Sequence, residues 1–179
     1  MQPNKVGRHL DQVNIVLFFT RGFFFFFSFV CFSFLFLLYL DIFDNVRKPK
    51  RKTLINKLDR IFSEYIRKRD ANKQGFVKCI TSGKKYHYTE VDAGHFISRK
   101  EMSTRWNEDN VYAQSRYDNR YRYGRQYEYS LALEKKKKGL PKHLYKLSKE
   151  TVKYSIADLQ ELIDKYKKKL DIENKRLSL

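Results

Sequence analysis

The sequence predicts an α+β fold, in which a small core of two strands and a helix is flanked by further helices and preceded by a hydrophobic transmembrane helix. Three observations carry this prediction. Residues 22–40 form an uncharged run that is long enough to span a bilayer. Apolar residues recur at helical spacing near both ends of the remaining chain. Between these two regions, short apolar runs alternate with turn residues, which is typical of short strands.

The first segment, residues 1–44, is rich in phenylalanine and is predicted to be a membrane anchor. Its central run, 22–40, has 19 residues without a charge, and a bilayer-spanning helix needs about 20 apolar residues. No small-residue cleavage motif follows, so an uncleaved anchor explains the run better than a secretory signal peptide. Lysines and arginines cluster after it, which places the C-terminal domain in the cytoplasm, tethered to the inner (plasma) membrane by one helix.

A second interpretation of this segment stays open. Twelve of the fifteen phenylalanines lie between Phe18 and Phe43, whereas leucine usually dominates in membrane helices. A T-rich stretch upstream of the true start of a gene would encode such a run. On that interpretation, residues 1–44 are a spurious N-terminal extension.

The charge of the chain indicates a polyanionic partner. The formal net charge is +18, and residues 1–44 contribute nothing to it because their basic and acidic residues cancel. A domain this basic repels itself unless it binds a polyanion. Nucleic acid is the leading candidate, and an anionic membrane surface is the second. The two cysteines, Cys31 and Cys79, lie in regions of opposite character, which argues against a disulfide between them, and one pair at most cannot make a disulfide framework.

The predicted elements follow one another along two further segments. Residues 45–53 form a basic linker, and residues 54–179 form the domain. We expect Thr53 to cap the first helix of this domain. The expected elements are a helix over residues 54–71, strands over 76–80 and 86–91, a helix over 117–138 that is interrupted near Gly124, and a final helix from 156 to about 176.

A histidine and several polar residues in the middle of the domain suggest a metal-dependent nuclease. His95 follows a strand, Asn110 comes fifteen residues later and Asn119 lies on the next helix, which is the skeleton of a ββα-metal site. A neutral histidine suits the base that activates water, and oxygen atoms of Asp and Asn suit Mg²⁺ or Mn²⁺. The amide of Asn110 would fix the loop that orients His95. By spacing alone, a structural histidine at the end of a strand would look the same.

Six blocks of the domain resemble one family in both sequence and order. The blocks are residues 58–67, 69–71, 92–99, 104–111, 119–120 and 126–129. On these residues the chain, from position 57 to 134, resembles the NinG (Rap) recombination proteins of lambdoid phages and prophages. The resemblance implies a DNA nuclease of the HNH-like group, which acts on branched recombination intermediates such as Holliday junctions or D-loops.

Carried over by position, the resemblance gives the polar residues their roles. His95 is the expected general base and Asn110 the residue that orients it. Asp92 and Asn119 are the expected contacts of the Mg²⁺ or Mn²⁺ ion. One departure concerns this metal: in many HNH sites an Asp immediately precedes the histidine, and here that position is Gly94, with Asp92 three residues before His95.

A second departure concerns structural zinc. The resemblance implies two Cys-x-x-Cys pairs, whose four thiolates bind Zn²⁺ and join a hairpin to a helix. The four positions are Cys79, Ser82, Ser115 and Asp118 in this chain, so one of the four cysteines remains. Because serine is not ionised near neutral pH and binds zinc weakly, we expect the zinc to be lost here. Either the packing of nearby tyrosines compensates for the lost folding energy, or this copy is decaying.

Arginines and one lysine are the expected DNA contacts. Tyrosine alternates with arginine between residues 112 and 129, so that arginine would contact phosphates and tyrosine would stack on unpaired bases. The alternative for any single residue is a tyrosine core under a solvated arginine face. The expected contacts are Arg99, Lys100 and Arg105, which flank His95, and Arg116, Arg120, Arg122 and Arg125 in the alternating stretch.

Three functions are compatible with these observations, and we favour the first. It is a divalent-metal-dependent endonuclease that acts on branched DNA recombination intermediates, for which a homodimer would suit the symmetry of a junction. The second is a DNA-binding recombination accessory protein whose catalysis has lapsed together with its zinc site. The third is a membrane-tethered basic protein that binds anionic lipid, and it predicts binding to vesicles at least as strong as binding to DNA.

Overall fold

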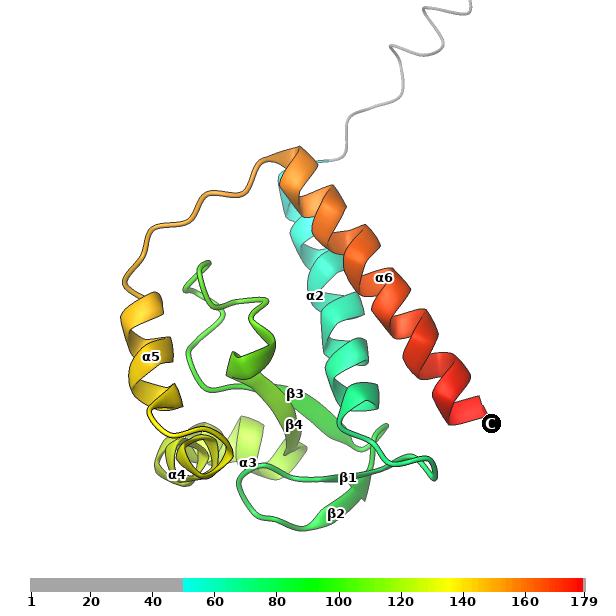
Figure 1. The fold of residues 1–179 in the computed structure, drawn as a ribbon, viewed down its shortest axis with the longest axis vertical. Coiled ribbons are helices and arrows are strands. Elements are labelled where there is room, and N and C mark those ends of the chain that lie inside the picture. The colour runs from blue at the N-terminus through cyan, green and yellow to red at the C-terminus, as the bar shows by residue number, and fades with distance from the viewer. Residues whose placement is uncertain (1–49, 179) are drawn as a thin grey trace, which may run out of the picture. The chain divides into compact units, whose positions relative to one another are not determined.

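The computed structural model describes residues 50–178, which form an α+β domain (Figure 1). The helices are α2 (Arg51–Arg69), α3 (Arg116–Tyr121), α4 (Gln126–Lys136), α5 (Leu140–Leu147) and α6 (Ile156–Ser178). The strands are β1 (Phe76–Lys78), β2 (Lys85–His87), β3 (Val91–His95) and β4 (Val111–Ser115), and two 3-10 turns are η1 (Glu108–Asn110) and η2 (Tyr123–Arg125).

The first and last of these helices, α2 and α6, lie side by side and run in the same direction (Figure 1). Each has an apolar stripe at helical spacing, and the two stripes meet in the largest buried cluster of the domain, together with Trp106 and Val111. Arg176 fastens the C-terminal ends of the two helices, because its guanidinium donates to the backbone oxygens of Lys68 and Ala71 at 2.6 and 2.9 Å.

The four strands form two separate antiparallel hairpins. β1 pairs with β2 across a turn in which Gly83 has a φ of 71°, a conformation that favours glycine. β3 pairs with β4 over five residues, from Val91 opposite Ser115 to His95 opposite Val111. Because α3 begins directly after β4, its side chains lie next to β3.

Helices α4 and α5 cover the second hairpin with another apolar cluster. Tyr129 of α4 is fully buried in this cluster. Its hydroxyl donates to the backbone oxygen of Gly94 at 2.8 Å and accepts from the backbone N–H of Tyr112 at 3.1 Å. One side chain thus joins α4 to both β3 and β4.

The architecture corrects the one that the sequence predicts. The expectation was a single small ββα-metal, HNH-like core between an N-terminal and a C-terminal helix, preceded by a transmembrane helix. That expectation is wrong, because residues 50–178 form five α-helices and two separate small sheets. The expected transmembrane helix, residues 22–40, lies outside the described residues. Within residues 50–178, no helix is both long and apolar enough to cross a membrane.

Several elements of the structure differ from the predicted ones, and each difference has a physical reason. α2 begins at Arg51, so Thr53 is not its cap; arginine and lysine are good helix formers, which lets the helix extend into the expected linker. β4 was not expected, because three consecutive buried residues at its end break the alternation of a half-buried strand. α5 was also missed: Pro141 lies in its first turn, where the missing N–H does no harm.

The final helix begins where the sequence predicts. Ser155 Oγ accepts from the backbone N–H of Asp158 at 3.1 Å, and the backbone N–H of Ser155 donates to Asp158 Oδ2 at 2.7 Å. This reciprocal pair satisfies two backbone donors that would otherwise lack partners at a helix start. The predicted start of the last helix is therefore confirmed.

Candidate functional site

A polar cavity of about 460 Å³ lies where α2, β3, α3 and the loop after β3 meet. Its lining residues are Ser63 from α2, Asp92, Ala93 and His95 from β3, Ser98 and Arg99 from the loop, and Asn119 and Arg120 from α3. The structure therefore brings five of the site residues expected from the sequence to one cavity. The two serines were not expected, and no sequence signal marks them.

His95 ends β3, and the loop that follows holds its ring. The ring nitrogen Nε2 lies 3.0 Å from the backbone oxygen of Arg105. Because a carbonyl oxygen only accepts, Nε2 carries the proton of the neutral ring and Nδ1 keeps its lone pair. Burial lowers the pKa of His95 to about 4, and the positive charge of Arg99 acts in the same direction. The imidazole is therefore neutral at physiological pH, as a general base must be.

Asn110 is fully buried and fixes the same loop. Its Oδ1 accepts from the backbone N–H of Ile97 at 2.7 Å. Its Nδ2 donates to the backbone oxygens of Ile97 and Thr104 at 3.0 and 3.1 Å. Thr104 directly precedes Arg105, whose oxygen holds His95. Asn110 does not line the cavity, so it acts on His95 through the backbone of the loop.

Asp92 is the carboxylate of the cavity and is held by its neighbours on α3. Asn119 Nδ2 donates to Asp92 Oδ2 at 3.0 Å, and the guanidinium of Arg120 donates to both carboxylate oxygens at 2.7 and 2.8 Å. Arg116 lies 4.0 Å from the same carboxylate. Burial raises the pKa of Asp92, but the hydrogen bonds from Arg120 and Asn119 outweigh it, so the pKa lies below its ordinary value.

The donor set of Asp92 and Asn119 suits a hard divalent cation. Mg²⁺ takes oxygen ligands, commonly one or two carboxylates with several waters. Asp92 supplies a carboxylate, and the side-chain amide of Asn119 supplies an oxygen once it is turned over. Within residues 50–178, no three His, Cys, Asp or Glu side chains converge to hold a metal. Water and substrate oxygens would therefore have to complete the shell.

Close packing against β4 explains why glycine, and not an acidic residue, directly precedes His95. A Cβ at this position would lie 2.2 Å from Oε1 of Gln114, on the neighbouring strand. A side chain at position 94 would therefore displace Gln114. Asp92 is the acidic residue of β3, and it does line the cavity.

The expected DNA contacts near His95 have different surroundings. Arg99 lines the cavity, and Lys100 beside it is exposed. Arg105 is occupied within the domain, because its Nε donates to a carboxylate oxygen of Asp59 at 3.0 Å and its Nη1 donates to the backbone oxygen of Arg99 at 2.8 Å. Arg105 therefore ties the loop to α2, whereas Arg99 and Lys100 are accessible.

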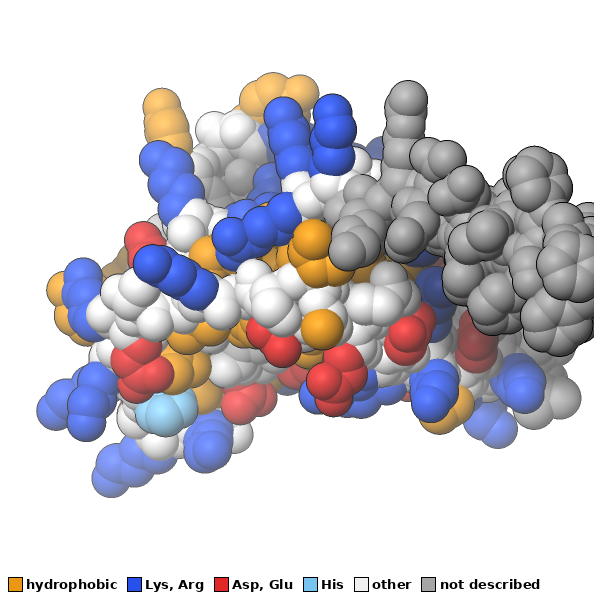
Figure 2. Space-filling model, turned by 90° about the horizontal axis from the view of Figure 1, so that it is seen from above, with side chains coloured by type: hydrophobic (Ala, Val, Ile, Leu, Met, Phe, Trp, Pro, Cys, Tyr) orange, Lys and Arg blue, Asp and Glu red, His pale blue; other side chains and the backbone are white. Residues whose placement is uncertain are grey.

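The arginines of the alternating stretch divide in the same way. Arg116 and Arg120 are exposed on α3 and flank Asp92, and Arg122 is exposed at the end of that helix. Arg125 is partly buried, and its guanidinium pairs with Glu128. More widely, lysine and arginine side chains project at many places on the face that Figure 2 shows, with acidic side chains between them.

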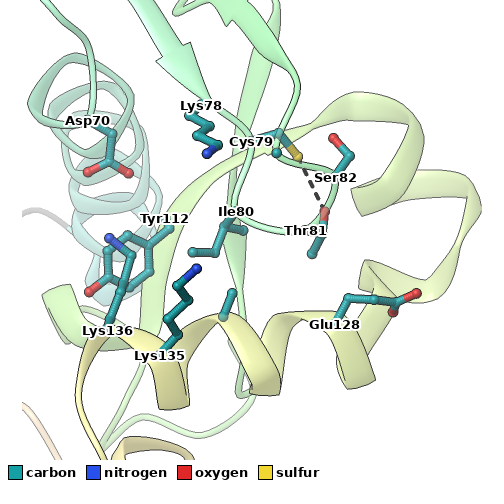
Figure 3. Close-up of a pocket in the computed structure, with 12 residues that line it drawn as sticks. Asp70, Lys78, Cys79, Ile80, Thr81, Ser82, Tyr112, Glu128, Lys135 and Lys136 are labelled. Atoms are coloured by element: carbon teal, nitrogen blue, oxygen red, sulfur yellow. Dashed lines mark hydrogen bonds between the residues drawn. The ribbon is translucent and has the colours of Figure 1, made fainter.

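The four positions expected to hold zinc converge between the β1–β2 turn and the start of α3. Figure 3 shows two of them, Cys79 and Ser82, in the β1–β2 turn. The backbone N–H of Ser115 donates to Cys79 Sγ at 3.2 Å. Thr81 Oγ1 donates to Asp118 Oδ2 at 2.8 Å, and the backbone N–H of Asp118 donates to Ser115 Oγ at 3.1 Å. Burial raises the pKa of the Cys79 thiol, but hydrogen bonds from Ser82 and Thr81 bring it below its ordinary value.

This cluster does not fit a zinc ion. Structural zinc sites use four Cys or His ligands, whereas these positions offer one thiol, two hydroxyls and one carboxylate. The structure uses these atoms for hydrogen bonds to one another instead. A second cavity, of about 670 Å³, lies beside this cluster. Its lining residues include Lys78, Lys135 and Lys136 (Figure 3).

These features define a basic α+β protein with a polar cavity that presents a neutral histidine, an ionised carboxylate and arginines. The sequence model of one family, described as bacteriophage Lambda NinG protein, matches residues 44–176. The chain belongs to this family and is a phage recombination-related protein, which confirms the resemblance predicted from its six sequence blocks. No curated protein and no solved structure matches the chain.

Proposed function

We propose that this protein is a divalent-metal-dependent endonuclease that cleaves branched DNA recombination intermediates. One observation carries the proposal: a neutral histidine shares a polar cavity with an ionised carboxylate and an amide that suit Mg²⁺ or Mn²⁺. Membership of a phage recombination family supports DNA as the substrate.

His95 is the general base in this proposal. Its Nδ1 takes a proton from a water molecule as the water oxygen attacks the phosphorus atom, and the bond from phosphorus to the leaving oxygen breaks. The hydrogen bond from Nε2 to the oxygen of Arg105 fixes the tautomer and the direction of the ring. Asn110 is a positioning residue, because it holds the loop that supplies this oxygen.

Asp92 and Asn119 would hold the metal ion, and Arg99 would bind the phosphate from the rim of the cavity. A divalent cation there supplies neutralisation of the charge that builds up on phosphate oxygens. Arg120 now donates to both oxygens of Asp92, so its guanidinium has to move before a cation can bind. Arg120 is largely exposed and is free to turn towards a DNA phosphate.

The ion pair between Arg120 and Asp92 also favours a second function. If Arg120 stays on Asp92 in the presence of DNA, the carboxylate is neutralised and the cavity recruits no metal. The protein would then be a DNA-binding recombination accessory without catalysis. The loss of the zinc ligands agrees with such a history.

Cleavage of a labelled four-way junction and of a matched linear duplex by the full chain, with Mg²⁺ or Mn²⁺, tests the proposal. We expect the junction to be cut and the His95→Ala variant to be inactive. His143→Ala is the matched control, because His143 is exposed on α5 and lies outside the cavity. Binding of the junction without cleavage under either metal would replace the nuclease by the accessory function.

A further inference from the structure

The stretch from α3 to the start of α4 exposes four tyrosines that the proposed chemistry does not use. Their exposed fractions are 63% for Tyr117, 74% for Tyr121, 94% for Tyr123 and 74% for Tyr127. By contrast, Tyr129, two residues further on, is fully buried. Aromatic side chains normally bury most of their surface, so a group of four exposed rings indicates a partner.

The backbone holds one of these rings in solvent at an energetic cost. Tyr123, Gly124 and Arg125 all have positive φ, at 50°, 72° and 44°. Positive φ is uncommon for residues other than glycine and unfavourable for a bulky one, so such strain tends to persist where it serves a function. The turn is fixed from inside the domain: Gln114 Nε2 donates to the backbone oxygen of Gly124 at 2.7 Å, and Arg125 pairs with Glu128.

Two of the exposed rings lie on the same helix as two residues of the cavity. Tyr117 and Tyr121 are one turn apart on α3, and their ring centroids are 6.2 Å apart. Asn119 and Arg120 of the same helix line the cavity. The two rings are therefore carried by the helix that forms one wall of the cavity.

The charge around the rings selects one class of partner. Arg116, Arg120 and Arg122 are exposed among the tyrosines, and the Arg122 guanidinium lies 6.0 Å from the centroid of Tyr117. An apolar protein surface would be a poor match for these cations. A nucleic acid strand supplies both phosphates for the arginines and flat bases for the rings. In a duplex the bases are stacked on one another, so only unpaired bases can reach the tyrosines.

We propose that Tyr117, Tyr121, Tyr123 and Tyr127 form a stacking surface for unpaired bases of a DNA strand, beside the cavity. The binding itself does not depend on catalysis. Only its use, which is to place a single-stranded flank next to the cleaved phosphate, rests on the proposed function. The surface would make an unpaired flank, such as the displaced strand of a D-loop, one of the features by which the protein binds a branched intermediate.

Fluorescence anisotropy with the full chain, in EDTA and at moderate salt, tests the binding apart from any cleavage. The probes are a labelled single strand, the same strand in a duplex, and the same strand with abasic positions. We expect Tyr117→Ala/Tyr121→Ala to weaken single-strand binding by about 10-fold or more, because a base stacked on an aromatic side chain contributes strongly. Duplex binding should change less than about twofold, since it depends on phosphates.

Two control variants and one further test variant keep the test decisive. Tyr117→Phe/Tyr121→Phe keeps both rings and should bind as the unaltered chain does. Tyr145→Ala removes an exposed ring, 59% accessible, on α5 and should have no effect. Tyr123→Ala should act like the Ala pair and should not weaken the fold. Equal binding of the abasic and the normal strand, or equal losses for Tyr145→Ala and the Ala pair, would overturn the stacking surface, whether or not junctions are cut.

Discussion

Arg120 covers Asp92: its Nε and Nη2 donate to Oδ2 and Oδ1 of the carboxylate at 2.7 and 2.8 Å. The two residues are 28 positions apart and meet because α3 folds back beside β3. The pair occupies both oxygens that a divalent cation would need. Metal binding and the position of Arg120 are therefore coupled, and this coupling can be measured.

Removal of the guanidinium should strengthen metal binding. We expect Arg120→Ala to raise the affinity of the chain for Mn²⁺ by no more than roughly fivefold, since an exposed ion pair is a weak competitor for the carboxylate. Titration with Mn²⁺ followed by electron paramagnetic resonance measures the free ion. Arg122→Ala removes an equal charge without touching Asp92 and should leave the affinity nearly unchanged. Equal effects of the two variants would mean that Arg120 does not compete with the metal.

Asn110 should be more important for stability than any polar residue of the cavity. In Asn110→Ala, one backbone N–H and two backbone oxygens lose their partners in a buried place. We expect the free energy of unfolding to fall by roughly 2–4 kcal/mol, as measured by urea denaturation. Asn119→Ala is the matched control: it loses one hydrogen bond in the cavity, and we expect a fall of less than about 1 kcal/mol. Similar losses for both would contradict the anchoring role of Asn110.

His95 should make the domain less stable in mild acid. Burial lowers the pKa of His95 to about 4 in the folded protein, whereas an unfolded histidine has a pKa of about 6.5. Between these values the unfolded chain binds a proton that the folded chain does not. The free energy of unfolding should therefore fall as the pH drops from about 6.5 to about 4, and the contribution of His95 is fully present above that range.

The contribution of His95 can be isolated by comparison with His95→Gln. We expect the unaltered chain to lose on the order of 1–3 kcal/mol more than the variant across this range. Carboxylates also titrate there, but they do so in both proteins. A second readout is the ring resonance of His95 in nuclear magnetic resonance, which should not titrate above pH 5. A titration midpoint of this resonance near pH 6.5 would show that the ring is solvated. Burial would then not be what keeps the imidazole neutral.

The sequence predicted the family better than it predicted the fold. The blocks around His95 and Asn110 are local, so their order along the chain is visible without any structure. The strand β4 lacks clear alternation, and its pairing with β3 spans the whole loop between them. The contacts that depend on that pairing, such as Arg120 on Asp92 and Ser63 at the cavity, join residues far apart and leave no local pattern.

The positions expected to hold zinc show the same contrast, because sequence could count the missing cysteines but could not show what replaces them. Asp118 is buried and accepts from Thr81 Oγ1, while Ser115 caps α3. This network still joins the β1–β2 turn to the helix that carries Asn119. These hydrogen bonds connect the turn and the helix directly, which leads to the last prediction.

Chelation should leave the stability of the domain unchanged, whereas loss of the buried carboxylate should not. We expect the midpoint of thermal unfolding to be the same with and without a strong zinc chelator, and elemental analysis of the purified chain to find no stoichiometric zinc. Asp118→Ala should lower the free energy of unfolding by roughly 1–3 kcal/mol, since it leaves the Thr81 hydroxyl without its acceptor. Asp164→Ala, on the exposed side of α6, is the control and should change little. One bound zinc per chain, with unfolding on its removal, would instead show that a thiol, hydroxyls and a carboxylate suffice for the ion.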